Sequence, residues 1–484
     1  MKNNFAPINR IPSEVFFVIP EHLEEDELDE NLIALTHVCR GWRELLIARP
    51  SLWTRLDCTN IDKTHVYIER SKISPLDLSL RRGGNIPYHE DAFLLVVPYI
   101  SRLKSLSIDG MEDILQVVTP HISCFVPLLR ELTIDLGCDP IPVLNGALFN
   151  GDLSSLHSLS LAGVITNLPW KNLSKLTTFK LSRVPEGKIS ITQLLNFFED
   201  AHHLRDITLQ DSIPTSSNAP PERVVPLPCL KILTILADPV HSTLLNHLSI
   251  PAGASVTLDF AFNGNRSPLP NFLPKDPGKL KNTFPTTSVN LSLGVFDKYV
   301  RLDGPSGGLY ILGHGEGWDR VTSAHLDNRI LRSLTYFVLS GIQRLAVTDS
   351  NLPATTKFTS SPAYQLLYRM KDLHTLTLTR SSNVPFILAL NPDLNPTKSI
   401  LCPNLKELVL YIERRNAFNL PELMSMAEER ALRHTKLSSI TIVGLGELLP
   451  GKEVFKLKEY VSHVDYKFRE KPPSWDSISE NGDD

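Results

Sequence analysis

The chain has 484 residues and a formal net charge of −4 at pH 7, from 49 basic and 53 acidic side chains. That length is enough for roughly two to three domains, and 42% hydrophobic with 21% charged residues is a globular composition. The balanced charge favours neither nucleic acid nor an anionic membrane as a partner. No run of about 18 apolar residues predicts a transmembrane helix.

The first ten residues, MKNNFAPINR, lack the apolar core of a secretory signal. The cysteines are scattered, and no CxxC pair indicates a zinc ribbon or a thioredoxin-like redox motif. They are Cys39, Cys58, Cys124, Cys138, Cys229 and Cys402. We therefore expect a reducing compartment, the cytoplasm or the nucleus, and no metal or cofactor.

The N-terminal sixty residues predict short amphipathic helices. Ser13 can cap a helix over Ile11–Leu23, which Pro20 would kink or end. The acidic run Glu24–Glu30 is expected to be a solvated connection. A second helix has its apolar residues on one face: Leu32, Leu35, Val38, Trp42 and Leu45. So short a region buries little surface alone, so the rest of the chain or a partner must cover it.

This N-terminal region resembles an F-box. The matching residues are Ile11, Pro12, Glu14, Val15, Leu23, Leu35, Val38, Cys39, Arg40, Trp42, Arg43, Pro50, Leu52 and Trp53. The sequence departs from the family pattern at Ile11, where leucine is usual, in the acidic spacer, and at Pro20.

The resemblance implies docking on the Skp adaptor of cullin–RING ubiquitin ligases. The adaptor-binding residues it implies are Ile11, Pro12, Glu14, Val15, Val18, Ile19, Leu23, Leu35, Val38, Cys39, Trp42, Leu45, Leu52 and Trp53. Tryptophans dominate buried interfaces, so Trp42 and Trp53 are expected to be part core and part interface. The alternative is that both pack only against the following domain.

A pattern of Leu-x-x-Leu-x-Leu, with conservative replacements, recurs ten times after residue 100. The copies begin at Leu103, Leu129, Leu156, Leu176, Leu204, Leu230, Ile342, Leu373, Leu405 and Leu437. Each alternation predicts a strand with one buried face, and stacked copies would form a continuous core. The region resembles leucine-rich repeats without their asparagine or cysteine, which predicts irregular turns. With the F-box, it is similar to the large class of fungal F-box proteins with degenerate repeats.

The expected fold is α/β: a small helical F-box followed by an irregular leucine-rich-repeat solenoid, or horseshoe. Its parts are an F-box at 1–60, a linker or first cap at 61–99, a solenoid at 100–465, and a disordered acidic tail at 466–484. Helices are expected at Ser190–His203 and Asn419–His434. A β-rich insertion is expected at 250–340, where a separate β domain is the alternative.

Residues between the core leucines should point to the concave face, because side chains alternate along a strand. Solenoids use such faces for protein recognition, here of an unknown protein target. The candidate target-binding residues are Asp109, Glu131, Asp135, Lys180, Asp206, Gln210, Arg344, Glu407 and Tyr411. Apolar residues on the same face, among them Ile232, Leu236 and Val409, are either contact anchors or covered by an insertion.

The segment GPSGG, at 304–308, matches a Gly-x-Ser-x-Gly nucleophile elbow centred on Ser306. An elbow must follow a strand and open a helix. Here the segments on both sides predict strands, so a hairpin turn is the better interpretation. His325 and Asp327 lie nearby in the sequence but add little, and a serine hydrolase is the weakest alternative.

The sequence therefore predicts the substrate-recognition subunit of an SCF-type cullin–RING ubiquitin ligase. The F-box would bind the Skp adaptor, and through it cullin, while the repeats hold the target. Such a chain is not an enzyme: it places the target near a ubiquitin-charged enzyme, which is catalysis by proximity. The rival is a non-enzymatic leucine-rich-repeat scaffold whose N-terminal helices only cap the solenoid.

Overall fold

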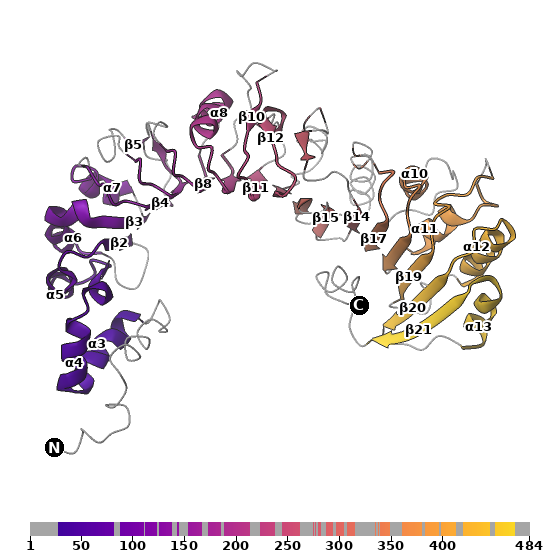
Figure 1. Cartoon of the computed structure of the whole chain (residues 1–484), viewed down its shortest axis with the longest axis horizontal. Helices are drawn as coiled ribbons and strands as arrows, with labels where there is room; N and C mark the ends of the chain where they lie inside the picture. The colour runs from indigo at the N-terminus through magenta and orange to yellow at the C-terminus, as the bar shows by residue number, and fades with distance from the viewer. Residues whose placement is uncertain are drawn as a thin grey trace. The chain divides into compact units, whose positions relative to one another are not determined.

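The structure is a computed structural model of the whole chain, and it divides into two compact units, 1–185 and 186–484. It describes residues 28–81, 88–110, 112–122, 125–137, 143–144, 153–166, 173–184, 188–212, 223–237, 244–261, 274, 276, 279–281, 287–293, 297–303, 307–314, 334, 337, 339–348, 361–379, 383–395, 398–412, 420–445 and 451–469. Each unit is described by itself below (Figure 1).

The first unit begins with helices and continues as a parallel sheet. Its helices are α3 (Leu28–Val38), α4 (Arg40–Ile47), η3 (Pro50–Trp53), α5 (Ile61–Ser71), α6 (Glu90–Val96), η4 (Val97–Arg102) and α7 (Glu112–Val118). Its strands are β1 (Arg55–Leu56), β2 (Leu76–Arg81), β3 (Leu103–Gly110), β4 (Glu131–Leu136), β5 (Val143–Leu144), β6 (Ser158–Ala162), β7 (Ile165–Thr166) and β8 (Thr178–Ser182).

The main sheet of this unit follows chain order. Strands β1, β2, β3, β4, β6 and β8 pair in parallel, each with the next. Parallel neighbours need a return connection, and helices α5, α6 and α7 fall in three of these connections. Strands β5 and β7 form a separate parallel pair.

Alternating leucines build the core of the first unit, because every second side chain of a strand points to the same face. The first leucine of each predicted copy, such as Leu103, is at most 2% exposed. The turn after β6 requires glycine: Gly163 has φ +61°, and a Cβ there would lie 1.9 Å from the carbonyl oxygen of Leu136.

The second unit has more strands and a helical layer toward its end. Its helices are α8 (Ile191–Asp200), η6 (Leu244–His247), α10 (Pro362–Arg369), α11 (Asn383–Leu390), α12 (Leu420–Leu432) and α13 (Gly451–Tyr460). Its strands are β9 (Asp206–Gln210), β10 (Val225–Pro226), β11 (Ile232–Ala237), β12 (Leu248–Ser249), β13 (Ser255–Ala261), β14 (Ser288–Leu293), β15 (Asp297–Asp303), β16 (Gly308–His314), β17 (Arg344–Thr348), β18 (Thr375–Thr379), β19 (Glu407–Ile412), β20 (Ser439–Leu445) and β21 (His463–Arg469).

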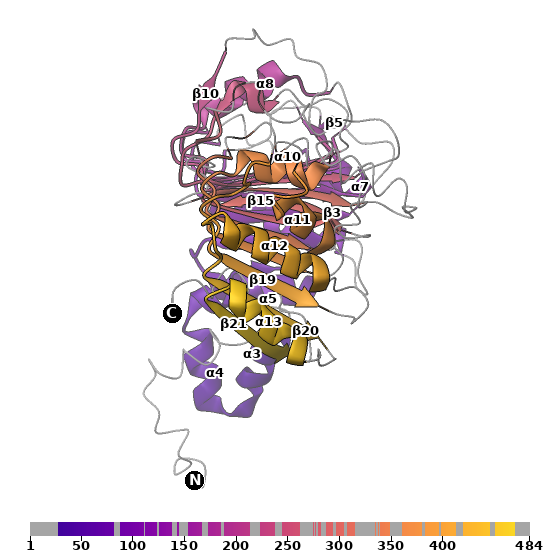
Figure 2. The ribbon, with the colours of Figure 1, turned by 90° about the vertical axis from the view of Figure 1, so that its right-hand side faces the viewer.

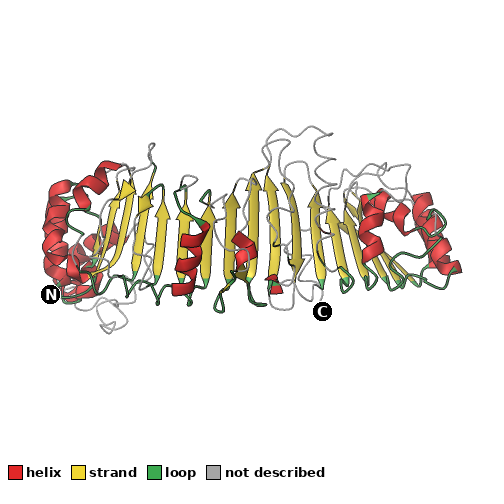
Figure 3. Cartoon of the chain, turned by 90° about the horizontal axis from the view of Figure 1, so that it is seen from above, coloured by secondary structure: helices red, strands yellow, loops and turns green. Residues whose placement is uncertain are grey.

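An antiparallel meander interrupts the parallel order of the second unit. Strands β9, β11 and β13 pair in parallel, as do β17 to β21 (Figure 3). Between them, β16 joins β13 in parallel, β15 pairs antiparallel with β16 and β14, and β14 joins β17 in parallel. The insertion predicted at 250–340 is therefore part of the sheet and not a separate β domain.

Helices α10, α11, α12 and α13 lie one after another in chain order along the last strands of this unit (Figure 2). The predicted helix after Ser190 is α8, where Ser190 and Gln193 form a reciprocal capping box. The predicted helix at 419–434 is α12. Both helix predictions are confirmed.

All ten predicted copies contain a strand. In nine of them, from β4 to β20, the strand starts two residues after the first apolar residue, and β3 starts at that residue itself, Leu103. Three boundaries differ from the sequence prediction. The region 61–99 was predicted as a linker or a first cap of the solenoid; the linker alternative is wrong, because the region holds α5, β2 and α6 and β2 pairs with β3. Strand β21 extends the sheet to Arg469, past the predicted start of the tail, and residues 470–484 lie outside the described part. The predicted repeat region is also divided, since the boundary between the two units falls between residues 185 and 186 of the chain.

Candidate functional site

The second N-terminal helix was predicted to run without a break from Leu32 to Leu45 after an acidic connection, and this is wrong. Helix α3 already starts at Leu28, inside the acidic run. The helical path then breaks at Cys39, whose backbone is extended at φ −159° and ψ 168° and whose Sγ accepts from the backbone N–H of Trp42 at 3.5 Å. Cys39 thus serves as the N-cap of α4.

The break changes which side chains are buried. Leu32, Thr36, Trp42 and Leu46 are the buried residues of α3 and α4. Of the predicted stripe, Leu35 and Leu45 are half-buried and Val38 is 57% exposed. An exposed valine at the end of a helix has apolar surface that a partner can cover.

Trp53 is a core residue of the first unit. It is 0% exposed, its Nε1 donates to the carbonyl oxygen of Leu46 at 2.9 Å, and its ring meets Tyr67 edge-on at 5.1 Å. The expected sharing of the tryptophans between core and interface is therefore corrected for Trp53, and Trp42 is only 8% exposed. Trp53 packs beneath the surface because its ring contact joins η3 to α5, and Trp42 is buried on α4.

Some of the predicted adaptor-binding residues are at least partly exposed in the structure, and we call the surface that they form the head surface. It consists of Leu35, Val38, Leu45 and Leu52. The half-buried Cys39 is the cap described above. Ile33, 39% exposed on α3, was missed because it lies off the predicted stripe, although an unburied isoleucine in so small a head was a usable signal. The remaining predicted residues lie outside the described residues: Ile11, Pro12, Glu14, Val15, Val18, Ile19 and Leu23.

The predicted target-binding residues lie on strands, in rows set by the register. In the first unit Asp109 of β3 pairs with Asp135 of β4, and Asp135 also forms an ion pair with Arg183. Glu131 and Lys180 are exposed and occupy two other rows. In the second unit Arg344, Thr375 and Glu407 form one continuous row.

The remaining members of that set are all in the second unit. Asp206 pairs with Ile232 and is half-buried, Gln210 is exposed, and Tyr411 is half-buried. Ile232 is 49% exposed, so in this structure it is not covered by an insertion. The structure thus brings these residues together as rows within each unit and not as one cluster.

The region around Ser306 has the geometry of a hairpin. Residue Asp303 of β15 pairs with Gly308 of β16 in an antiparallel ladder, so a strand follows the turn where a nucleophile elbow needs a helix. Ser306, His325 and Asp327 lie outside the described residues. The hairpin prediction is confirmed for the two flanking strands.

Other chemical features are few in the part of the chain that the structure describes. No group of three or more His, Cys, Asp or Glu side chains there could hold a metal ion. Within the same ranges, no helix combines the length and apolar character that crossing a bilayer requires. Burial raises the pKa of the thiols of Cys58 and Cys402 to about 12, so both remain protonated.

Comparison with protein families gives one match. Residues 8–59 match the F-box-like family, so the chain carries an F-box-like domain that ends six residues after Trp53. No curated protein matches the chain. F-box domains generally bind Skp-type adaptors, which points to a role as a ubiquitin ligase adaptor in general.

Proposed function

We propose that this chain is the substrate-recognition subunit of an SCF-type cullin–RING ubiquitin ligase. The observation that carries the proposal is the F-box-like match at residues 8–59. The exposed Val38 and the half-buried Leu35 and Leu45 support it, because a small helical head with uncovered apolar side chains suits a partner that covers them.

In this proposal the parallel strands of each unit are degenerate leucine-rich repeats that hold a target protein. The strand residues Asp109, Arg344 and Glu407 are exposed on strands of a parallel ladder, and the rows are rich in hydroxyl groups between these charges. The chain itself supplies no reacting group: it binds the target and holds it near a ubiquitin-charged enzyme. The cytoplasm or the nucleus is where such a complex would act.

The adaptor contact is tested by co-expressing the full chain with a Skp-type adaptor and measuring the adaptor that co-purifies. Val38→Asp places a charge on the head surface, and we expect at least a tenfold loss of recovered adaptor. Leu432→Asp is the matched control, since Leu432 is also the last residue of a helix and is 68% exposed. We expect it to retain the adaptor.

Failure of the wild-type chain to recover the adaptor, or equal recovery by Val38→Asp, would favour the scaffold alternative. Removing residues 1–60 is a poor substitute for these point variants. It would take away Trp53 and uncover Tyr67 of α5, so loss of binding could not be separated from loss of folding.

A further inference from the structure

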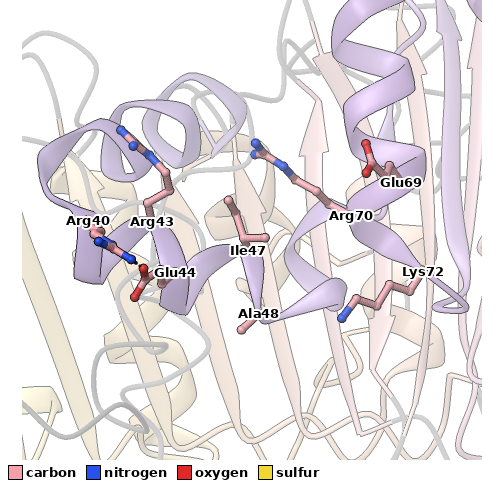
Figure 4. A pocket seen from close by; sticks show the side chains of 8 residues that line it. All are labelled: Arg40, Arg43, Glu44, Ile47, Ala48, Glu69, Arg70 and Lys72. Carbon is pink, nitrogen blue, oxygen red and sulfur yellow. Dashed lines mark hydrogen bonds and ion pairs between the residues drawn. The ribbon is translucent and has the colours of Figure 1, made fainter.

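An open groove lies between α4 and α5 in the first unit (Figure 4). Its lining residues are Arg40, Arg43, Glu44, Ile47, Ala48, Glu69, Arg70 and Lys72. The residues from α5 and its C-cap lie beyond the F-box-like match, which ends at residue 59. The groove is therefore built jointly by the F-box-like region and the helix that follows it.

The groove has an excess of positive charge. It holds four cationic side chains and two carboxylates. Arg40 already pairs with Glu44, its neighbour one turn along α4, through Nε and Oε1 at 2.7 Å. Among the other lining residues, three side chains are positively charged, Arg43, Arg70 and Lys72, and one is negatively charged, Glu69. Within the described part of the chain, no ion pair engages the side chains of these three cations.

Both remaining arginines are held in place by the protein. Nε of Arg43 donates to the carbonyl oxygen of Thr36 on α3 at 2.9 Å. The guanidinium carbon of Arg70 lies 4.3 Å from the ring centroid of the buried Trp53. An arginine stacked on an indole ring keeps the N–H groups at its edge for a ligand. Little side-chain entropy then remains to be lost when an anion binds.

The floor of the groove is apolar. Figure 4 shows the half-buried Ile47 between Arg43 of α4 and Arg70 of α5. The groove residues of α4 share one helix face, because Arg40, Arg43, Glu44 and Ile47 are three, four and seven residues apart. Leu45 of the head surface lies roughly 140° around the helix from Arg40. The groove is therefore a second surface of the same helix.

We propose that this groove binds an acidic peptide segment of a partner protein, with an aliphatic side chain on Ile47 and carboxylates on either side. Arginine forks match carboxylates in a bidentate manner. A phosphate group fits less well. Glu69 lines the same groove, and it would repel a doubly charged phosphate more strongly than a singly charged carboxylate.

The test is fluorescence anisotropy with the full chain and a labelled probe, the peptide Gly-Glu-Asp-Leu-Glu-Asp-Gly. Its partner probe has Gln and Asn in place of Glu and Asp. We expect the acidic probe to bind and the neutral probe to bind at least tenfold more weakly. Lys72→Glu should weaken binding about threefold to tenfold, because it reverses one exposed charge without removing packed side chains. Arg43→Gln with Arg70→Gln should weaken binding at least tenfold.

Arg130→Glu is the matched control, because Arg130 is an exposed arginine of the same unit outside the groove. It should bind the acidic probe as the wild type does. Binding that is equal in wild type, Lys72→Glu and the double variant would overturn the proposal. So would tenfold tighter binding of a phosphoserine probe, since that would assign the groove to phosphate.

A last measurement separates the groove from the head surface. Saturating the chain with a Skp-type adaptor should leave the affinity for the acidic probe within twofold. Complete competition would show that the groove is part of the adaptor contact, and would overturn its assignment to a separate partner. The probe measurement on the chain alone does not depend on whether an adaptor binds, so the two proposals fail independently.

Discussion

The two ends of the chain hold their helices by different means. In the first unit, η3 and α5 join through the aromatic contact of Trp53 with Tyr67, both nearly or fully buried. In the second unit, α12 buries Leu423 and Met426 and is in addition tied by polar groups: Arg430, 0% exposed, donates to the carbonyl oxygens of Leu401 and Cys402 at 2.9 and 3.0 Å.

The polar attachment extends along the helices of the second unit. Cys402 has φ 47°, so its turn bends back, and its Sγ contacts the carbonyl oxygen of Leu367 in α10 at 3.4 Å. Asn395, 2% exposed, donates to the backbone oxygen of Ser399 at 2.7 Å and accepts from the hydroxyl of Tyr364 at 3.3 Å. Buried amides and a guanidinium thus tie neighbouring strand–helix segments together.

The two units therefore show two ways to attach a helix to the rest of its unit. Aromatic packing gains stability from apolar area removed from water, and it tolerates small shifts. Polar anchoring satisfies buried carbonyl groups that would otherwise be costly, and it depends on geometry. Burial lowers the pKa of Arg430 to about 10, which is still far above neutral pH, so the guanidinium remains charged where it is buried.

The largest expected effect comes from breaking the aromatic contact. Trp53→Ala should lower the free energy of unfolding of the first unit by about 3–5 kcal/mol, because it leaves a cavity beneath η3 and frees Arg70 from its stacking position. Urea denaturation measures this loss of unfolding free energy. Leu52→Ala, at the half-buried neighbour, should cost less than about 1.5 kcal/mol, and equal losses for the two variants would contradict the core role of Trp53.

Removing the hydrogen bonds of Arg430 should lower the free energy of unfolding less than Trp53→Ala does, but by a measurable amount. Arg430→Met keeps much of the side-chain volume and removes both donors, so we expect a loss of about 2–3 kcal/mol from the second unit. Arg433→Met is the control, because Arg433 directly follows the same helix. Arg433 is partly exposed, donates to the backbone carbonyl oxygen of Lys398 and pairs with Glu429 at 3.4 Å, so its loss should cost less than about 1 kcal/mol. If Arg430→Met left the free energy of unfolding unchanged, the carbonyl oxygens of Leu401 and Cys402 would have found other donors.

The smallest expected effects concern two aspartates of the first unit with opposite pKa shifts. Burial opposes ionisation of Asp57, but hydrogen bonds from Lys63 at 2.7 Å and from Thr59 outweigh it and lower its pKa. For Asp77, burial raises the pKa despite Lys104 at 3.7 Å. The lowered group adds stability above its unfolded pKa of about 3.9, and this is lost as pH falls through the folded pKa.

Asp57→Asn should therefore cost about 1 kcal/mol at pH 7, and the difference from the wild type should shrink below about pH 4. Asp77→Asn should be neutral or slightly stabilising at pH 7, since ionisation of Asp77 is unfavourable in the folded state. Thermal unfolding between pH 3 and pH 7 measures both. A destabilising Asp77→Asn at pH 7 would mean that the Lys104 pair outweighs burial.

Local patterns predicted much of this fold. Ten alternating segments became ten strands, and Ser190 and Pro421 lie at the starts of predicted helices, because strand and helix periods and N-terminal caps are properties of short segments. The break at Cys39 escaped prediction, since the apolar spacing from Leu32 to Leu45 continues through it. The groove escaped too, because Arg43 and Arg70 come from different helices.

The sequence by itself determined that ten alternating segments are strands, which of their residues form the buried faces, and that an F-box-like head precedes them. These follow from periodicity and motif, which neighbouring residues carry. Only the tertiary structure decided that Trp53 lies in the core, that β14, β15 and β16 form an antiparallel meander within the sheet, and that Arg430 is buried on the carbonyls of a distant turn. Those outcomes depend on contacts between residues far apart in the chain, which no local pattern encodes.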